Sequence, residues 1–285
     1  MNEQLNILRK VKRPDLCLMY ITNRIEIACI AEKNTVDRIF IDLETIGKEK
    51  RQGHVDSVKS KHSISDVSLI KNAISKAKLL VRVNPFYAGT RKEVDEVIER
   101  GADIVMLPMY KTMEQVQHFV DYVGGRAKVL LLCETNEAAS LVSETAALDG
   151  VSEMFIGLND LHLAKNMKFM FELLADGTVD DLCSKMSKQN IPYGFGGIAQ
   201  LNVGMLPAQY IIAEHYRLGS SMAILSRSFY DSSGVDEKSF VENLFKYGVK
   251  SIRSYEKDII KESDEFFVKN HLSVVEKVNN IVNNL

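Results

Sequence analysis

The sequence has few of the features that mark secreted, membrane-spanning or nucleic-acid-binding proteins. Its four cysteines are scattered among 285 residues and form no Cys-x-x-Cys pair, so we expect reduced thiols instead of disulfides or a zinc site. The formal net charge is only −2, which gives no global field for binding nucleic acid or a membrane surface. No apolar run approaches transmembrane length, and the first residues lack a signal-peptide pattern. We therefore expect a cytoplasmic protein that binds neither nucleic acid nor membrane.

What the sequence does contain is an alternation of apolar runs and amphipathic helical patterns. Eight runs have the composition of buried parallel strands. They lie at residues 16–22, 38–43, 79–84, 104–108, 129–134, 154–157, 193–195 and 222–225. Helical patterns lie at residues 24–33, 67–77, 91–100, 113–123, 137–148, 203–213 and, as a broken stretch, 166–189. This alternation predicts an α/β protein with a closed (β/α)8 barrel, a TIM barrel.

An open, doubly wound sheet is the competing architecture. Residues 20–24, directly after the first apolar run, contain no glycine, whereas a dinucleotide-binding sheet carries a Gly-x-Gly-x-x-Gly loop there. The open sheet is therefore disfavoured. The length and the hydrophobic content of 46% suit a single barrel domain over residues 1–285 better than two small domains.

The end of the chain contains more helix than a barrel needs to close. Residues 236–285 are predicted to form a C-terminal helical extension of two amphipathic helices. One apolar stripe consists of Phe240, Leu244, Phe245, Val249 and Ile252, and the other of Phe267, Val274, Val275, Val278 and Val282. Such a stripe must be covered by its own barrel or by a partner subunit, so we expect a homo-oligomer with either arrangement of the extension.

Two carboxylates follow directly on two consecutive predicted strands. Glu134 comes after residues 129–133, and Asp160 comes after residues 154–159. The carboxyl ends of barrel strands hold the active site in this architecture. Two hard oxygen ligands side by side suit Mg²⁺ or a similar divalent ion. The alternative interpretation is that each acid only caps the helix that follows it.

Five strings in chain order resemble the conserved strand ends of the HpcH/HpaI aldolase and citrate lyase family. They are Phe-Ile-Asp-Leu-Glu at 40–44, Val-Arg-Val-Asn-Pro at 81–85, Gly-Ala-Asp-Ile-Val-Met-Leu-Pro at 101–108, Leu-Cys-Glu-Thr at 132–135 and Ile-Gly-Leu-Asn-Asp-Leu at 156–161. The resemblance implies a barrel that binds pyruvate, or its enolate, on a divalent metal and makes or breaks a carbon–carbon bond beside it. Mg²⁺ is the first candidate for this metal, with Mn²⁺ or Co²⁺ as alternatives.

The resemblance also implies roles for individual residues. Glu134 and Asp160 would be the metal ligands. Arg82 would contact the keto oxygen and stabilise the enolate, while Asp42 and Glu44 would orient Arg82 or a metal-bound water. An enolate needs fixed positive partners in a dry site, and a divalent ion with an arginine supplies them. The alternatives are a lysine Schiff base, for which the predicted strand ends carry no lysine, and a purely structural arginine.

Substrate-binding groups are expected on two further segments. The resemblance implies that backbone amides from Gly157 through Asn159 to Leu161 hold the substrate carboxylate at a helix N-terminus. The glycines of residues 194–197 would allow close approach of an anion, although a tight turn explains them almost as well. Arg227 follows the eighth strand on the same side of the barrel and could bind a substrate anion.

One position departs from the family pattern. Pyruvate aldolases of this family have a histidine directly after Asp-x-Glu of the second strand, where this chain has Thr45, and a hydroxyl cannot serve as acid–base group near neutral pH. Residues 47–63 are basic, contain two glycines and lack apolar periodicity, which predicts a lid over an anionic substrate. Within it, His54 or His62 could supply the missing proton shuttle. A solvated surface loop is the alternative.

These observations together predict a metal-dependent carbon–carbon lyase or aldolase acting on a 2-keto acid, with a phosphorylated or sugar-like partner suited to the basic loop. Two other functions remain open. A transferase that uses phosphoenolpyruvate would employ the same barrel, because phosphoenolpyruvate is the trapped enol of pyruvate. A barrel without the acid–base group could also be a non-catalytic, metabolite-binding protein.

Overall fold

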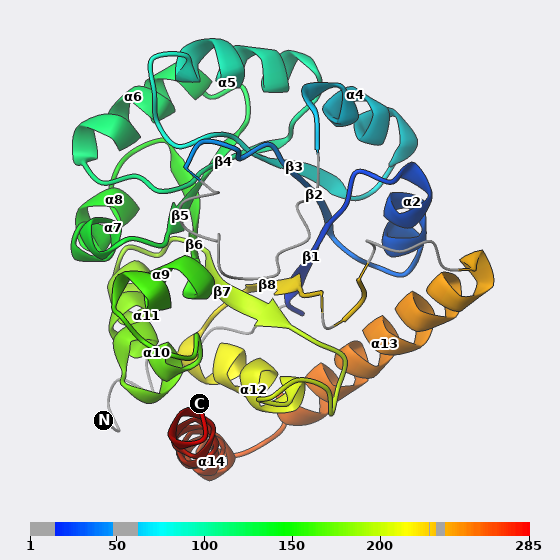
Figure 1. The fold of residues 1–285 in the computed structure, drawn as a ribbon, viewed down its shortest axis with the longest axis vertical. Coiled ribbons are helices and arrows are strands. Elements are labelled where there is room, and N and C mark those ends of the chain that lie inside the picture. The colour runs from blue at the N-terminus through cyan, green and yellow to red at the C-terminus, as the bar shows by residue number, and fades with distance from the viewer. Residues whose placement is uncertain (1–14, 48–61, 228, 232–236) are drawn as a thin grey trace.

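The computed structural model describes residues 15–47, 62–227, 229–231 and 237–285. Eight parallel strands follow one another around a closed barrel, with β1 against β8 (Figure 1). Their bounds are β1 Cys17–Ile21, β2 Arg38–Asp42, β3 Lys78–Arg82, β4 Ile104–Leu107, β5 Lys128–Cys133, β6 Val151–Ile156, β7 Tyr193–Ile198 and β8 Met222–Leu225. The predicted (β/α)8 barrel is confirmed.

Helices surround the strands and pack on their outer face. The helices between strands are α2 Ile25–Lys33, α4 Ile64–Ala73, α5 Thr90–Glu99, α6 Met113–Val123, α7 Asn136–Ser140, α8 Val142–Ala146, α9 Leu158–Ala164, α10 Glu172–Ala175, α11 Thr178–Lys188 and α12 Ala208–Leu218. After β8 come α13 Lys238–Ile259 and α14 Asp264–Asn283. None of the helices among the described residues is long and apolar enough to cross a membrane.

The alternation of side chains along each strand separates two cores. Residues facing the helices form one large buried cluster, and a smaller cluster with members from β1 to β6 and β8 fills the barrel interior. Phe40, Leu132 and Phe155 belong to this interior cluster, and the next inward positions along β2, β5 and β6 are Asp42, Glu134 and Gly157. The apolar filling therefore ends where the polar strand ends begin.

The opposite end of the barrel interior contains a buried ion pair that the sequence did not predict. Arg38, the first residue of β2, donates to both carboxylate oxygens of Glu153 on β6, at 2.5 and 2.9 Å. Lys128 of β5 adds a contact of 3.2 Å to the same carboxylate. Active sites of such barrels lie at the carboxyl ends of the strands, so this pair closes the amino end of the barrel and is assigned a role in stability.

Some helices differ from the helical patterns predicted from the sequence. The helix predicted at 203–213 begins only at Ala208, because Asn202 and Gly204 have left-handed backbones and the extended Pro207 precedes the first turn. No helix was predicted over α9, whose seven residues are too few to show a helical period. Short elements of this kind are where sequence periodicity is weakest.

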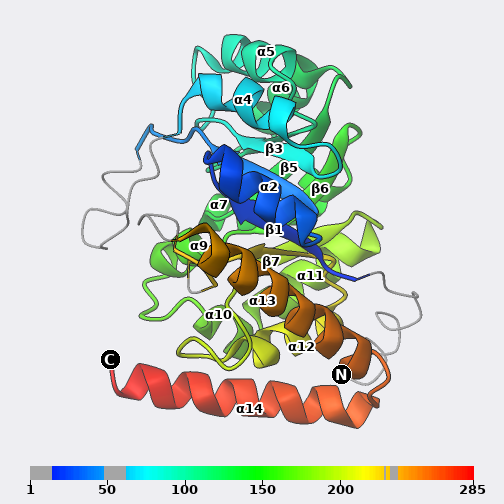
Figure 2. The same cartoon turned by 90° about the vertical axis from the view of Figure 1, so that its right-hand side faces the viewer.

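The two C-terminal helices take different positions. Helix α13 packs between α2 and α12 and covers the outside of the barrel next to β1 (Figure 2). Helix α14 lies beyond α12 and contacts α10 and α12 of its own chain. Phe267, Val274 and Val278 of the predicted stripe are buried there. Both predicted helices are present, and the homo-oligomer stays a prediction.

Candidate active site at the carboxyl ends of the strands

Arg82, the last residue of β3, lies between two carboxylates from the end of β2. The parallel register pairs Asp42 with Arg82. The two oxygens of Asp42 accept hydrogen bonds from Nε at 2.9 Å and Nη2 at 2.8 Å, and Glu44 lies 3.4 Å from Nη2. The exposed fractions of the three side chains are 14% for Arg82, 6% for Asp42 and 2% for Glu44. The structure thus brings these three predicted residues together.

The guanidinium of Arg82 is held along one edge. Burial opposes its charge, but Asp42, then Glu44 and also Glu134 raise the pKa of Arg82 above its usual value, so it is a permanent cation. Its carbon lies 5.7 Å from the centre of the Phe40 ring, within cation–π range. No acceptor among the described residues bonds to Nη1. That nitrogen is therefore suited to donating to an oxygen of a ligand.

Glu134 follows β5 and is held in place by the turn after β4. Its Oε1 accepts a hydrogen bond from the backbone nitrogen of Met109 at 3.1 Å. Met109 has a positive φ of 54°, a left-handed conformation that is strained for a residue other than glycine. Such strain concentrates at functional sites, where the surrounding structure maintains it. The sequence contained no signal for this contact.

Gly157, at the end of β6, packs closely against Glu134. A Cβ atom built on Gly157 would lie 2.8 Å from both Cβ and Oε2 of Glu134, so a side chain there would displace the carboxylate. The backbone nitrogen of Gly157 also donates to the carbonyl of Cys133 at 2.9 Å. This hydrogen bond connects the ends of β5 and β6 at the residue before Glu134.

The alternative in which both acids cap the following helices fits Glu134 poorly. Helix α7 is capped by Thr135, whose hydroxyl accepts from the nitrogen of Ala138. Asp160 lies in the first turn of α9, and Gly157 occupies the N-cap position of that helix. A carboxylate in a first turn favours the helix electrostatically, which remains a possible contribution of Asp160.

The donor set of Glu134 and Asp160 fits a hard divalent ion. Carboxylate oxygens are the ligands that Mg²⁺ and Mn²⁺ prefer, and Mg²⁺ usually takes one or two carboxylates and fills its remaining positions with water and substrate. Among the described residues, no group of three or more His, Cys, Asp or Glu side chains could hold a metal. Two carboxylates alone suit an ion whose other ligands come from outside the protein.

Thr45 is held by a set of hydrogen bonds to the side chain of Asn84, which the sequence did not predict and which is called the clamp below. Asn84 Oδ1 accepts from the nitrogen of Thr45 at 2.9 Å, from its hydroxyl at 3.1 Å and from the nitrogen of Ile46 at 3.0 Å. The amide group of Asn84 in turn donates to Glu93 of α5 at 2.8 Å. This clamp ties the chain after Glu44 to the loop after β3.

The two histidines proposed from the sequence have different outcomes. His54 lies outside the described residues. His62 directly precedes Ser63, the N-cap of α4, and its Nδ1 accepts a hydrogen bond from the backbone nitrogen of Asp42 at 2.9 Å. Of the two, His62 is thus shown to be attached to the strand end that holds Arg82.

The predicted substrate-binding residues lie on the same side of the barrel. Asn159 is exposed, while Leu161 is buried and its nitrogen donates to the carbonyl of Gly157 at 3.1 Å. First-turn amides before Leu161 have no acceptor within the helix, so they are better suited than that of Leu161 to a substrate oxygen. Arg227 is exposed after β8.

The glycines at the end of β7 have a packing role. A Cβ on Gly194 would lie 2.4 Å from the carbonyl oxygen of Met222, and one on Gly196, where φ is +54°, would lie 2.7 Å from Leu158. The register of β7 and β8 shifts between Gly194 and Gly197. Close strand contact and a bulge therefore account for these glycines.

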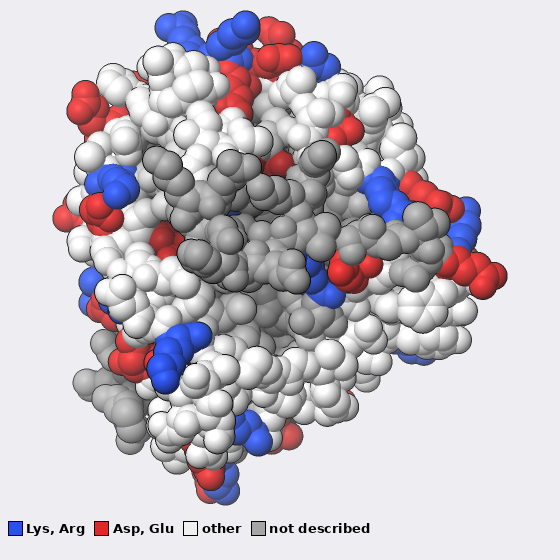
Figure 3. All heavy atoms as spheres, in the orientation of Figure 1, with Lys and Arg blue, Asp and Glu red and all other residues white. Residues whose placement is uncertain are grey.

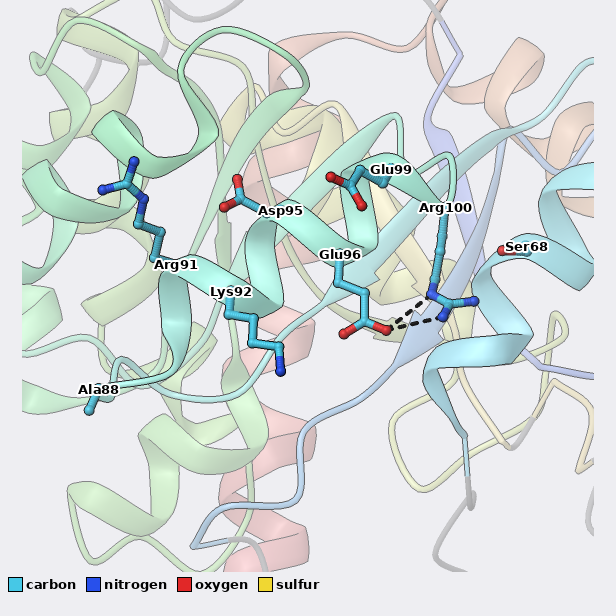
Figure 4. A pocket seen from close by; sticks show the side chains of 8 residues that line it. All are labelled: Ser68, Ala88, Arg91, Lys92, Asp95, Glu96, Glu99 and Arg100. Carbon is cyan, nitrogen blue, oxygen red and sulfur yellow. Dashed lines mark hydrogen bonds and ion pairs between the residues drawn. The ribbon is translucent and has the colours of Figure 1, made fainter.

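Two surface features lie outside this site. A hollow on the outer side of the barrel is lined by Ser68 of α4, Ala88 and charged residues of α5, including the ion pair of Glu96 with Arg100 at 3.1 Å (Figure 4). It includes none of the predicted site residues. Acidic and basic side chains alternate over the described part of the face in Figure 3, so no charge of one sign dominates the surface shown there.

Comparison with known proteins is consistent with this arrangement. The solved structure of an HpcH/HpaI aldolase from Desulfitobacterium hafniense DCB-2 has a TM-score of 0.59 and 14% identity, covering 89% of this chain and 96% of that one. An HpcH/HpaI aldolase/citrate lyase family protein from Burkholderia cenocepacia J2315 has a TM-score of 0.57 and 14% identity, covering 90% and 100%. The citrate synthase SbnG has a TM-score of 0.56 and 13% identity, covering 90% and 98%. Such low identities show the shared fold alone.

Sequence comparison is more specific. No curated protein matches the chain. The family model described as HpcH/HpaI aldolase/citrate lyase matches residues 17–169, the segment from β1 through α9 that carries Asp42, Arg82, Glu134 and Asp160. Since this match covers more than half of the chain and all of these strand ends, the protein belongs to the HpcH/HpaI aldolase/citrate lyase family.

Proposed function

We propose that the lyase- or aldolase-type function of this family takes, in this chain, the form of metal-dependent cleavage or formation of a carbon–carbon bond next to a 2-keto acid. The observation that carries this proposal is the buried Arg82 cation, held by Asp42 and Glu44 through Nε and Nη2. A cation fixed in a dry site stabilises negative charge far better than one in water. Its Nη1 would donate to the oxygen on which the enolate charge develops.

Glu134 and Asp160 would hold the divalent ion. Bound there, the ion would supply Lewis-acid polarisation of the substrate oxygens. The chain itself orients Glu134, through the amide of Met109 at 3.1 Å on one side and through close packing on Gly157 on the other. A ligand held in this way needs no rearrangement when the ion binds.

Membership of the family supports carbon–carbon chemistry, because the family model that matches residues 17–169 is described as HpcH/HpaI aldolase/citrate lyase. The alternative of a phosphoenolpyruvate-using transferase depends on the Lys and Arg residues of the loop after β2, which lie in 48–61, outside the described residues. The substrate class we favour is a small 2-keto acid, because the held cation of Arg82 suits an enolate oxygen.

Calorimetric titration of oxalate, a stable mimic of the pyruvate enolate, tests this proposal. With Mn²⁺ present we expect saturable binding that disappears when the metal is omitted. Glu134→Ala and Asp160→Ala should each weaken oxalate binding by at least ~10-fold, because each removes a ligand of the ion. The control is Glu114→Ala, which removes a carboxylate that is 82% exposed on α6 and should leave binding unchanged.

The possible results of the oxalate titration lead to different conclusions about the site. Metal-dependent binding that is lost in both ligand variants and kept in the control supports the enolate site. Equal binding in Glu134→Ala and in the unmodified protein would contradict the assignment of the ligands. Folding of each variant is checked by circular dichroism, so that loss of binding is not mistaken for loss of structure.

A further inference from the structure

The clamp on Thr45 depends on which way the side-chain amide of Asn84 points. Its Oδ1 accepts from the nitrogen of Thr45 at 2.9 Å, from the hydroxyl of Thr45 at 3.1 Å and from the nitrogen of Ile46 at 3.0 Å. Two of these three donors are backbone N–H groups, which can only donate. The amide oxygen must therefore face Thr45 and Ile46, and the NH₂ group of Asn84 must point away from them.

Glu93 of α5 lies on the other side of this amide. Its Oε1 accepts from Nδ2 of Asn84 at 2.8 Å and from the backbone nitrogen of Asn84 at 3.2 Å. Because Oε1 receives two N–H groups, it presents lone pairs to both and requires the NH₂ end of the amide. Reversing the amide would set Oδ1 against Oε1 and the NH₂ group against two backbone N–H groups. The groups on both sides of Asn84 therefore select the same orientation.

The clamp acts on the segment that carries Glu44. Glu44 directly precedes Thr45, and its carboxylate lies 3.4 Å from Nη2 of Arg82 with 2% of the side chain exposed. Thr45 and Ile46 are themselves exposed, so the hydrogen bonds to Asn84 fix them more than packing does. Asn84 lies two residues after Arg82. The chain after β3 thus carries both the guanidinium and the side chain that holds the segment of its carboxylate partner.

We propose that Glu93 is a positioning residue for the candidate active site. It orients the amide of Asn84, the clamp fixes the residues after Glu44, and the carboxylate of Glu44 stays beside Arg82. This inference rests on the proposed function, in which Arg82 stabilises the enolate charge, and adds a residue outside the strand ends to it. A cation stabilises a developing charge best when its own partners are fixed in advance.

The first test measures the clamp without a substrate. Amide hydrogen exchange of Thr45 and Ile46, followed by NMR, is compared in the unmodified protein, Glu93→Ala and Glu96→Ala. We expect both amides to exchange about 5- to 10-fold faster in Glu93→Ala, because the clamp loses the acceptor that orients it. Glu96 lies on the same helix and pairs with Arg100 instead, so Glu96→Ala should exchange like the unmodified protein. Equal exchange in all three proteins would overturn the inference.

The second test measures oxalate binding with Mn²⁺ in variants of Glu93. Glu93→Gln keeps a carbonyl acceptor for the amide of Asn84 and should bind oxalate within about 3-fold of the unmodified protein. Glu93→Ala removes the acceptor and should bind about 10-fold more weakly. Glu96→Ala is again the control and should bind like the unmodified protein. Unchanged binding in Glu93→Ala would restrict Glu93 to a structural role and contradict the inference.

A double-variant cycle tests whether the effect passes through Glu44. Glu44→Gln removes the charge that pairs with Arg82, so adding Glu93→Ala to it should change oxalate affinity by less than about 2-fold. A further loss of about 10-fold in this background would show that Glu93 acts by another route, against the inference. Circular dichroism and urea unfolding confirm that each variant is folded under the conditions of the titration.

These experiments keep the inference distinct from the proposed function. If the unmodified protein bound no oxalate under any metal condition, the enolate site itself would be refuted, and the role of Glu93 in it as well. The exchange rates of Thr45 and Ile46 would still show whether Glu93 orients Asn84. If oxalate bound normally and only the exchange and affinity of Glu93→Ala were unchanged, the proposed function would stand and the role of Glu93 would be refuted.

Discussion

At the scale of single residues, Met109 shows how the backbone prepares a functional side chain. Its positive φ of 54° turns its N–H toward Oε1 of Glu134. A left-handed conformation costs about 1–2 kcal/mol for a residue with a Cβ. The contact with Glu134 and the barrel around it must offset this cost. The strain marks the position as one where ligand geometry takes precedence over local stability.

Replacing this methionine with glycine tests the strain. Met109→Gly should lower the free energy of unfolding by about 1–2 kcal/mol less than Met113→Gly, because glycine is unstrained at positive φ. Met113, the first residue of α6, is a matched control, since both methionines are half-buried and only Met109 has positive φ. Urea unfolding followed by circular dichroism provides the measurement. Equal losses in the two variants would show that Met109 is not strained.

At the scale of secondary-structure elements, one buried carboxylate joins three helices. Glu214 of α12 accepts from Arg217 of the same helix at 2.6 Å and from Asn270 and His271 of α14 at 2.9 and 3.0 Å. Arg217 also bonds Asp180 of α11 at 2.6 Å. Burial opposes the charge of Glu214, but His271 and Arg217 lower its pKa, so the carboxylate is ionised. The network attaches α14 to its own barrel.

Removing this carboxylate should loosen α14. Glu214→Ala leaves the buried Arg217 with one partner fewer and removes both contacts to α14, so we expect a loss of about 3–5 kcal/mol in the free energy of unfolding. Limited proteolysis should also cut faster between α13 and α14. Glu276→Ala, on the exposed side of α14, is the control and should change neither measurement. Unchanged proteolysis of Glu214→Ala would show that apolar packing alone holds α14.

Elements of the barrel differ in how well the sequence predicted them. Helix α6 and strand β8 have the predicted bounds, because an amphipathic stripe or an apolar run between turn signals determines each locally. The helix predicted at 137–148 is two helices, α7 and α8, that meet at Leu141. The hydroxyl of Ser140 bonds the carbonyl of Asn136 at 3.0 Å, one of the local side-chain contacts that weaken a helix. Periodicity does not report such contacts.

At the scale of the whole molecule, a buried histidine links stability to pH. His215 of α12 is fully buried, stacks on Phe195 of β7 at 3.9 Å and bonds the hydroxyl of Ser220 at 2.7 Å. Burial lowers the pKa of His215 to about 3, so the ring is neutral in the folded protein. In the unfolded chain it takes up a proton near its ordinary pKa of 6.5.

The sign of the effect follows from these two values. Between pH 6.5 and about 3 the unfolded chain binds a proton that the folded protein does not, so the free energy of unfolding falls as the pH falls. This group alone contributes a slope of about 1.4 kcal/mol per pH unit. Urea unfolding at several pH values should give a shallower dependence for His215→Gln than for the unmodified protein. Parallel curves would show that His215 is protonated in the folded state.

The sequence by itself determined the barrel and the strand ends that carry the candidate site. Eight apolar runs separated by helical patterns leave few architectures that bury every run. In a barrel of parallel strands, Glu134 and Asp160 must then both lie at the carboxyl ends of the strands. The strings at 40–44 and 81–85 also place Asp42 and Arg82 at the ends of the second and third strands. These two strands are neighbours and parallel, so the two residues meet in register.

Only the tertiary structure decided what these side chains touch. The amide of Met109 reaches Glu134, Asn84 reaches Thr45, and the amide of Asp42 reaches His62. Each contact joins residues at least 20 positions apart, and each depends on where a loop closes over the strand ends. A strained φ at Met109 and the orientation of the Asn84 side-chain amide result from that closure. They leave no period or motif in the sequence, because hydrogen bonds across loops are selected by geometry and not by residue spacing.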